Sequence, residues 1–260
     1  MRDLITVQGV VLSAMPVGEY DKRIVLLTRQ RGKISAFAKG ARRQNSPFMA
    51  ASNPFVFGNF TLYEGRTSYN LNQVSVSRQF TELARVQPGI YYGYYFLELA
   101  DYFGQEGTDE REMIDLLYLT AKALLNPKLD SRLVRCVFEL RTMAVQGLQP
   151  GLFGCVCCNA VPSSGETVYF SQKLHGILDG ACLKSGEALD AIPLSGSALY
   201  AMQYIVATPL KNVYSFTVTE EVLLELERHI YTYTAQNTDR RFKSLAILET
   251  VCDTGLHVTR

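Results

Sequence analysis

Two groups of residues in this chain have the types and spacing needed for chemistry. The first is cationic: Lys22–Arg23 is followed, after an apolar stretch, by the run KGARR at 39–43. Cationic heads on a rigid frame contact phosphates, and Arg also grips a phosphate with two parallel hydrogen bonds or stacks on a base. The sequence therefore predicts a polyanion-binding surface formed by Lys22–Arg23 and by the turn with Lys39, Arg42 and Arg43.

The second group is rich in cysteine. Cys155 and Cys158 are separated by two residues, the spacing that lets two thiolates reach one tetrahedral zinc ion. Cys182 follows at a suitable distance, but Ser185 stands where a fourth cysteine would complete the set. Cys157, His175 or a water molecule could supply the fourth ligand. The three predicted metal ligands are thus Cys155, Cys158 and Cys182, with a structural zinc ion or metal-free packing as the alternatives.

The charge distribution supports a polyanionic partner. The net charge of the 260 residues is only +1. Residues 1–80 nevertheless hold eleven Lys/Arg against four Asp/Glu, and no carboxylate lies between Lys22 and Tyr63. The remainder holds fifteen basic and twenty-one acidic residues. A local excess of this size attracts polyanions, and the alternative is a basic face without a partner.

Five strands are expected to position the basic turn. Apolar and polar residues alternate in segments rich in β-branched side chains. Five strands in about 75 residues suit a small closed barrel of the OB-fold type better than a sandwich of about seven. The expected strands are 4–14, 22–29, 33–40, 55–64 and 67–77.

From about residue 82 the apolar residues recur at helical spacing. Residues 150–188 interrupt this pattern with the cysteines and a short strand at 167–170. The fold class predicted is therefore α+β and multidomain: an OB-fold barrel at 1–80 and an all-α domain at 81–260 with a zinc-finger-like insertion. The expected helices are 88–103, 110–126, 131–148, 197–208, 219–237 and 243–251.

Several aromatic residues allow two interpretations. Phe48, Phe55 and Phe57 lie near the basic turn and could stack on bases as in OB-folds, although core burial is the simpler interpretation for Phe55 and Phe57. The tyrosines of 91–102 are interpreted as helix packing, because aromatics at helical spacing usually pack. His229, among charged residues of an amphipathic helix, is expected on the surface.

Signatures of enzymes are missing: there is no Walker motif, GxGxxG, HExxH or GxSxG. No run of roughly 20 apolar residues could span a bilayer, and the start of the chain has no secretory pattern. We therefore expect a non-enzymatic, cytoplasmic protein with reduced cysteines and no membrane partner.

The chain resembles the RecO family of bacterial recombination mediators. The resemblance is carried by GVVLSAMPVGEYDKRIVLLTRQRGKISAFAKGARR, by FELRTMAVQGLQPGLFGCVCC and by RRFKSLAIL, in that order. It implies binding of single- and double-stranded DNA, strand annealing, and loading of the RecA recombinase with RecR onto DNA coated by single-strand-binding protein (SSB). It also implies binding of the SSB acidic tail. The DNA-binding residues would be Arg23, Lys39, Arg42 and Arg43, and the metal ligands Cys155, Cys158 and Cys182.

Two alternatives and one open position remain at this point. An OB-fold adaptor for RNA or the ribosome would have the same basic barrel, and a hydrolase or nuclease would need a carboxylate or metal constellation. The tail-binding site has no short motif. Its candidate cations are Arg132 and Arg135, or Arg240, Arg241 and Lys243, unless these are solvated charges at helix ends.

Overall fold

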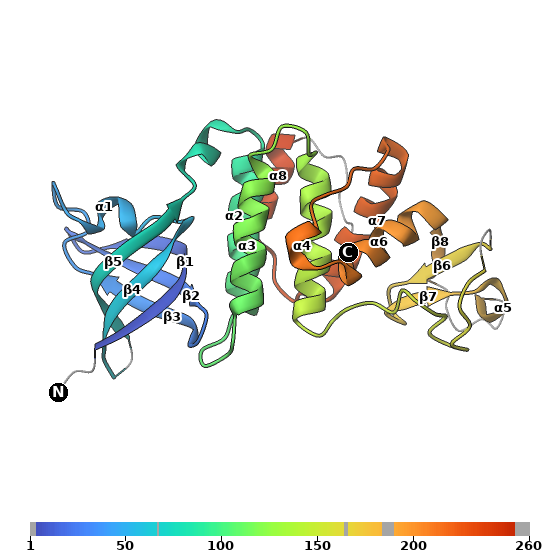
Figure 1. The fold of residues 1–260 in the computed structure, drawn as a ribbon, viewed down its shortest axis with the longest axis horizontal. Coiled ribbons are helices and arrows are strands. Elements are labelled where there is room, and N and C mark those ends of the chain that lie inside the picture. The colour runs from blue at the N-terminus through green and yellow to red at the C-terminus, as the bar shows by residue number, and fades with distance from the viewer. Residues whose placement is uncertain (1–3, 67, 164–165, 184–189, 253–260) are drawn as a thin grey trace. The chain divides into compact units, whose positions relative to one another are not determined.

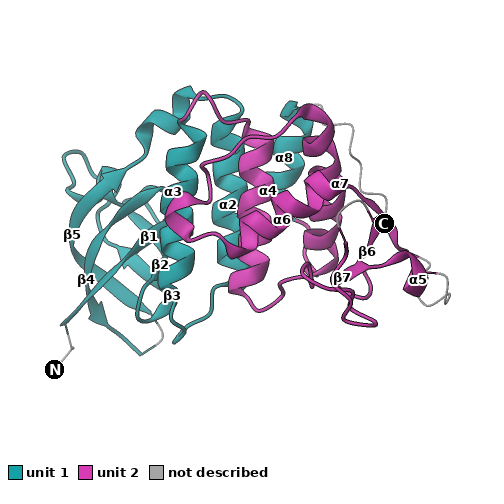
Figure 2. Ribbon diagram, turned by 45° about the vertical axis from the view of Figure 1, so that its right-hand side comes forward, with its two compact units in different colours: residues 1–125, 242–252 teal, residues 126–241, 253–260 magenta. Residues whose placement is uncertain are grey.

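A computed structural model shows a β-barrel followed along the chain by helices and a second, smaller sheet (Figure 1). The structure describes residues 4–66, 68–163, 166–183 and 190–252. These residues pack into two compact units (Figure 2). Unit 1 holds the described residues up to Leu125 together with Phe242–Cys252, and unit 2 holds those from Asn126 to Arg241. The domain boundaries predicted from the sequence, 1–80 and 81–260, are not the same as these contact-based units, and they stay a prediction.

Five strands close the barrel of unit 1 in the order β1-β2-β3-β5-β4. All neighbouring pairs are antiparallel except β3 with β5. The predicted OB-fold barrel is confirmed, with each strand close to its expected position. The strands are β1 (Leu4–Val17), β2 (Asp21–Thr28), β3 (Gly32–Ala38), β4 (Val56–Glu64) and β5 (Tyr69–Gln79).

The long first strand closes the barrel because it serves two neighbours. Its first half pairs with β4 as far as Val10, and its second half pairs with β2 from Gly9 onward. A Cβ atom on Gly9 would lie 2.2 Å from the carbonyl oxygen of Leu27. Only glycine lets the two backbones approach this closely.

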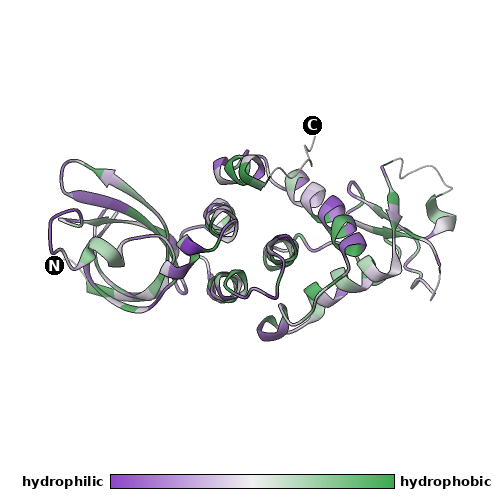
Figure 3. Ribbon diagram, turned by 90° about the horizontal axis from the view of Figure 1, so that it is seen from above, coloured by the Kyte–Doolittle hydropathy of each residue, from purple (hydrophilic) through white to green (hydrophobic). Residues whose placement is uncertain are grey.

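Alternation along the strands separates a packed interior from a polar exterior. In Figure 3 the barrel strands carry hydrophobic and hydrophilic residues in turn. Residues two apart share a face of a strand, so the inward set forms one continuous core. That core includes Val11, Ile24, Leu26, Ile34, Ala36, Phe60 and Leu62.

Helices complete unit 1. They are the short α1 (Phe48–Ala51), the 3₁₀ turn η1 (Thr81–Arg85), α2 (Gly89–Phe103), α3 (Arg111–Leu124) and α8 (Lys243–Cys252). Helix α2 packs against both α3 and α8, and its Glu98 accepts a hydrogen bond from the backbone N–H of Ser244 at 2.9 Å. Tyr92 and Tyr95 of α2 are buried, which confirms packing as the role of these two tyrosines.

Unit 2 combines three helices with the cysteine-bearing insertion. Helix α4 (Ser131–Val145) packs against α6 (Gly196–Ala207) and α7 (Glu220–Gln236). The insertion contains a three-stranded sheet in the order β7-β6-β8 and the short helix α5 (Gly180–Leu183). Its strands are β6 (Val168–Ser171), β7 (Gly176–Leu178) and β8 (Ile192–Leu194), and the turn η2 (Leu210–Asn212) follows α6.

The expected helices are all present, with ends that differ by a few residues. The sequence did not predict α1, α5, β7 or β8, because three or four residues are too few to show a period. None of the described helices is long and apolar enough to cross a membrane.

Candidate nucleic-acid interface and metal centre

The basic turn lies directly after β3 and is held by backbone hydrogen bonds. Gly40 adopts a φ of 67°, which favours glycine, and its N–H donates to Oδ1 of Asp21 at 2.7 Å. The N–H of Arg42 donates to the carbonyl oxygen of Tyr20 at 2.8 Å. These two bonds tie the turn to the start of β2, so that Tyr20–Asp21 and the KGARR run form one hydrogen-bonded unit.

The four predicted phosphate-binding residues are exposed. Arg23 on β2 donates from Nε to Ser35 Oγ at 2.8 Å, and Arg42 donates to the carbonyl oxygen of Gly18 at 3.3 Å. The guanidinium of Arg43 lies over the Tyr20 ring, 5.1 Å from its centroid. Within the described ranges, no carboxylate lies at ion-pair distance from Arg23, Lys39, Arg42 or Arg43.

Lys22, beside the predicted set, has a different environment. Its Nζ donates to Oδ1 of Asn53 at 2.8 Å and to the carbonyl oxygen of Met49 at 3.2 Å. Burial and the nearby Arg42 lower the pKa of the Lys22 ammonium. Lys22 therefore holds the α1 segment against the barrel and adds positive charge beside Arg42.

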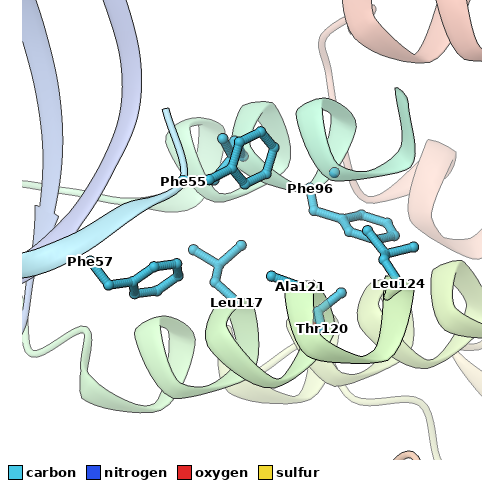
Figure 4. A pocket seen from close by; sticks show the side chains of 9 residues that line it. Phe55, Phe57, Phe96, Leu117, Thr120, Ala121 and Leu124 are labelled. Atoms are coloured by element: carbon cyan, nitrogen blue, oxygen red, sulfur yellow. The ribbon is translucent and has the colours of Figure 1, made fainter. Parts of the chain in front are cut away.

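The three phenylalanines near the turn are packing residues. Phe48 packs against the barrel core. Phe55 and Phe57 are buried as expected, but outside the barrel, where they line an apolar pocket with residues of α2 and α3 (Figure 4). The Phe57 ring contacts those of Phe80 and Tyr118 edge to face. The base-stacking interpretation is therefore wrong for Phe55 and Phe57, because both rings are already covered.

The insertion brings the three predicted metal ligands together. Cys155, Cys158 and Cys182 form a cluster with Asp179, and their ligand atoms all lie within 4.8 Å of one another. Cys155 is buried, whereas Cys158 is exposed. Three thiols and a carboxylate are a donor set that zinc accepts in tetrahedral sites. The residues present therefore fit a metal ion.

Asp179 is the functional residue that the sequence analysis missed. It accepts a hydrogen bond from the Cys158 thiol at 3.0 Å and one from the backbone N–H of Cys182 at 2.6 Å. These bonds, that from Cys158 first, lower the pKa of Asp179 to about 2. The signal was its spacing: Asp179 precedes Cys182 by three residues, as Cys155 precedes Cys158. The fourth-ligand candidates predicted from the sequence, Cys157 and His175, do not include it.

The other candidates for a fourth ligand do not join the cluster. Cys157 is exposed and lies outside it. His175 instead shares a hydrogen bond of 3.3 Å between its Nδ1 and the Tyr233 hydroxyl. Ser185 lies outside the described residues.

Two further expectations in unit 2 are wrong. His229 is fully buried, and its Nε2 lies 3.2 Å from the carbonyl oxygen of Pro193. Arg135 is also buried: its Nε donates to Glu139 at 2.6 Å, and its guanidinium lies 3.5 Å from the centroid of the Tyr231 ring. Arg132 makes ion pairs with Asp130, Glu220 and Glu227. The charge pattern of a helix does not show which of its charged side chains pair with one another, so the sequence does not predict these ion pairs.

The fold and these sites together define a class: an OB-fold barrel joined to a helical part with a cysteine-rich insertion. The family model described as "Recombination protein O N terminal" matches residues 1–80, and the one described as "Recombination protein O C terminal" matches residues 89–246. The chain belongs to the RecO family of DNA repair proteins.

Similar curated proteins agree over nearly the full length. A DNA repair protein RecO from Symbiobacterium thermophilum is 33% identical over 251 residues, which cover 95% of this chain and 98% of that protein. The DNA repair protein RecO of Acetivibrio thermocellus is 28% identical, with 94% and 95% covered. That of Alkaliphilus metalliredigens is 29% identical, with 95% and 100% covered.

Proposed function

We propose that this chain is a recombination mediator that binds single- and double-stranded DNA through the basic turn and promotes annealing. The observation that carries the proposal is the set of four exposed cations at one end of the barrel, with no carboxylate partner among the described residues. An unpaired cation loses little when it meets a phosphate, because no existing ion pair must break. The strands behind the turn supply the rigid frame.

Phosphate contacts carry no sequence information. Arg23, Lys39, Arg42 and Arg43 would therefore bind any strand, which suits a protein that meets arbitrary sequences during repair. Two complementary strands held by a cationic surface also repel each other less, because the cations screen their phosphates. Annealing then follows from charge neutralisation, without a catalytic group.

The proposed partners follow from the family. They are RecR, the acidic tail of SSB and, indirectly, the RecA filament. The acidic tail needs accessible cations, and Arg132 and Arg135 are already engaged with carboxylates. Arg240, Arg241 and Lys243 are exposed and stay the candidates for this contact.

A zinc ion in the insertion belongs to the same proposal. Cys155, Cys158, Cys182 and Asp179 would hold it, and as a structural ion it would join the segment around Cys155 to α5. Among the described residues, the apolar cluster around these ligands has Cys155 and Leu178 as its buried members. A metal ion would therefore contribute much of the local stability.

An annealing assay tests the proposed function. Two complementary labelled oligonucleotides should anneal faster with the protein than without it, and the Arg42→Gln/Arg43→Gln variant should lose most of this acceleration. The matched control is Lys173→Gln/Lys211→Gln, which removes two exposed cations outside the barrel. Equal acceleration by all three proteins would rule out the basic turn as the DNA site.

Two further arms address the alternative functions. In magnesium or manganese the labelled strands should stay intact, because the proposed annealing needs no catalytic group. A structured RNA should compete less effectively than single-stranded DNA of equal length. Preferential binding of the RNA would instead favour an RNA adaptor.

A further inference from the structure

The outer face of the barrel beside the basic turn carries apolar side chains in register with a cation. Met15 on β1 pairs with Arg23 on β2, and Arg23 pairs with Phe37 on β3. Directly paired residues share one face of a sheet. Their neighbours Ile24, Ala36 and Ala38 belong to the barrel core, so Met15, Arg23 and the half-buried Phe37 point outward.

Tyr20 lies at the same end of these strands. It precedes β2 in the turn after β1, and 43% of its surface is exposed. Its carbonyl oxygen accepts from the N–H of Arg42, and the Arg43 guanidinium covers part of its ring. This placement holds a partly accessible aromatic ring directly beside Arg43.

Met15 has 59% of its surface exposed and adds an apolar side chain beside Arg23 and Phe37. Exposed Met and Tyr side chains offer apolar surface to a ligand. Single-strand-binding proteins use aromatic surfaces of this kind to stack bases, with contacts to the nucleic-acid backbone beside them. A duplex keeps its bases stacked inside, and only its phosphates and groove edges are accessible. An apolar surface between cations can therefore add affinity for a single strand and none for a duplex.

We propose that Tyr20 and Phe37 are base-stacking residues that give the barrel a preference for single-stranded over double-stranded DNA. The inference rests on the DNA binding proposed above and assigns its strand selectivity to two named rings. Arg23, Lys39, Arg42 and Arg43 serve both forms through phosphates. Tyr20 and Phe37 act only where bases are unstacked.

The test uses the full chain and three probes: a 20-nucleotide oligo-dT, a base-free strand of the same length, and a 20-base-pair duplex. The wild-type protein should bind oligo-dT more tightly than the base-free strand. In Tyr20→Leu/Phe37→Leu this difference should shrink by at least about fivefold, since one stacked base contributes about that factor or more. Affinity for the duplex and for the base-free strand should change less than about twofold, because the phosphate contacts remain.

Two controls separate stacking from other effects. Tyr20→Phe keeps the ring and should retain wild-type selectivity, whereas Tyr200→Ala removes an exposed tyrosine of α6 and should change nothing. Thermal unfolding of Tyr20→Leu/Phe37→Leu should match the wild type, and Tyr20→Leu alone provides the test if Phe37→Leu perturbs the barrel.

Each result has one meaning. If Tyr20→Leu/Phe37→Leu keeps the wild-type difference in affinity between oligo-dT and the base-free strand, the inference is overturned. An equal loss of affinity for all three probes overturns it too, because the rings would then act by positioning Arg43. A wild-type protein that binds none of the probes contradicts the proposed function itself.

Discussion

Asp179 adds a fourth possible ligand to the three predicted cysteines, and its position depends on the fold. The spacing of Cys155 and Cys158 predicts half of a metal site, and the Asp179–Cys182 pair has the same spacing with a carboxylate in place of one thiol. Carboxylates are frequent on every surface, so only the fold distinguishes this one. The α5 segment places it beside the thiols, and no feature of the sequence alone required that.

The metal assignment predicts the behaviour of Asp179 variants. Asp179→Asn removes a charged donor and should weaken zinc binding by more than about tenfold, the loss that even an outer partner of a ligand causes. Asp179→Cys should retain the ion, because it completes a four-thiolate set. Competition with a chromophoric chelator measures both.

Cys157→Ser is the matched control, since Cys157 lies outside the cluster, and it should bind zinc like the wild type. Metal analysis of purified wild-type protein showing less than about one-tenth of an equivalent of zinc would show that the cluster holds no zinc ion. The thiols would then be packing residues.

At the level of elements, sequence patterns gave the long strands and helices and failed where tertiary contacts decide. The five barrel strands alternate clearly, and the helices repeat their apolar residues at helical spacing. Phe57 alternates like a barrel residue, yet its ring faces the helices, because the exterior of β4 is covered there. His229 lies in a helix with a charged pattern, yet the sheet of the insertion covers it.

The contact of α7 with that sheet predicts a pH dependence. Burial lowers the pKa of His229, although the nearby Glu225 opposes this effect. Nε2 faces the carbonyl oxygen of Pro193, and the buried Nδ1 has no hydrogen-bond partner within the described chain. A second proton would therefore enter at Nδ1, where no acceptor meets it.

The direction in which stability changes with pH follows from proton uptake by His229. The unfolded chain binds a proton at His229 near the ordinary pKa of about 6.5, and the folded chain binds it only at lower pH. The stability that neutral His229 supports is therefore present above about pH 6.5 and is lost as the pH falls toward the folded pKa. One such proton changes the free energy of unfolding by at most about 1.4 kcal/mol per pH unit.

Denaturant unfolding between pH 7.5 and about 5.5 measures this slope, in a range above the ordinary carboxyl pKa values. His229→Gln should reduce the pH slope, whereas His175→Gln, which replaces an exposed histidine, should leave it unchanged. A His229→Gln variant with the wild-type slope would show that another group titrates.

At the scale of the whole molecule, charge was the most informative feature of the sequence. The basic excess of residues 1–80 predicts that this part of the chain binds polyanions, and the barrel gathers four of those cations at one end. The acidic remainder was less informative. Its arginines Arg132 and Arg135 looked accessible by sequence but are neutralised by carboxylates from α7 and α4. Pairing of this kind depends on helix packing, which charge counts do not contain.

The turn after β3 is proposed to bind DNA through phosphates, and the salt dependence of DNA affinity is the sharpest test of that proposal. Fluorescence anisotropy with a single-stranded oligonucleotide should show log affinity falling linearly with log salt. In Lys39→Gln/Arg42→Gln/Arg43→Gln, affinity should fall and the slope should become shallower by about 0.7 for each lost contact, or about 2 in all. A triple variant with wild-type affinity and slope would contradict the claim and place the DNA site elsewhere on the protein.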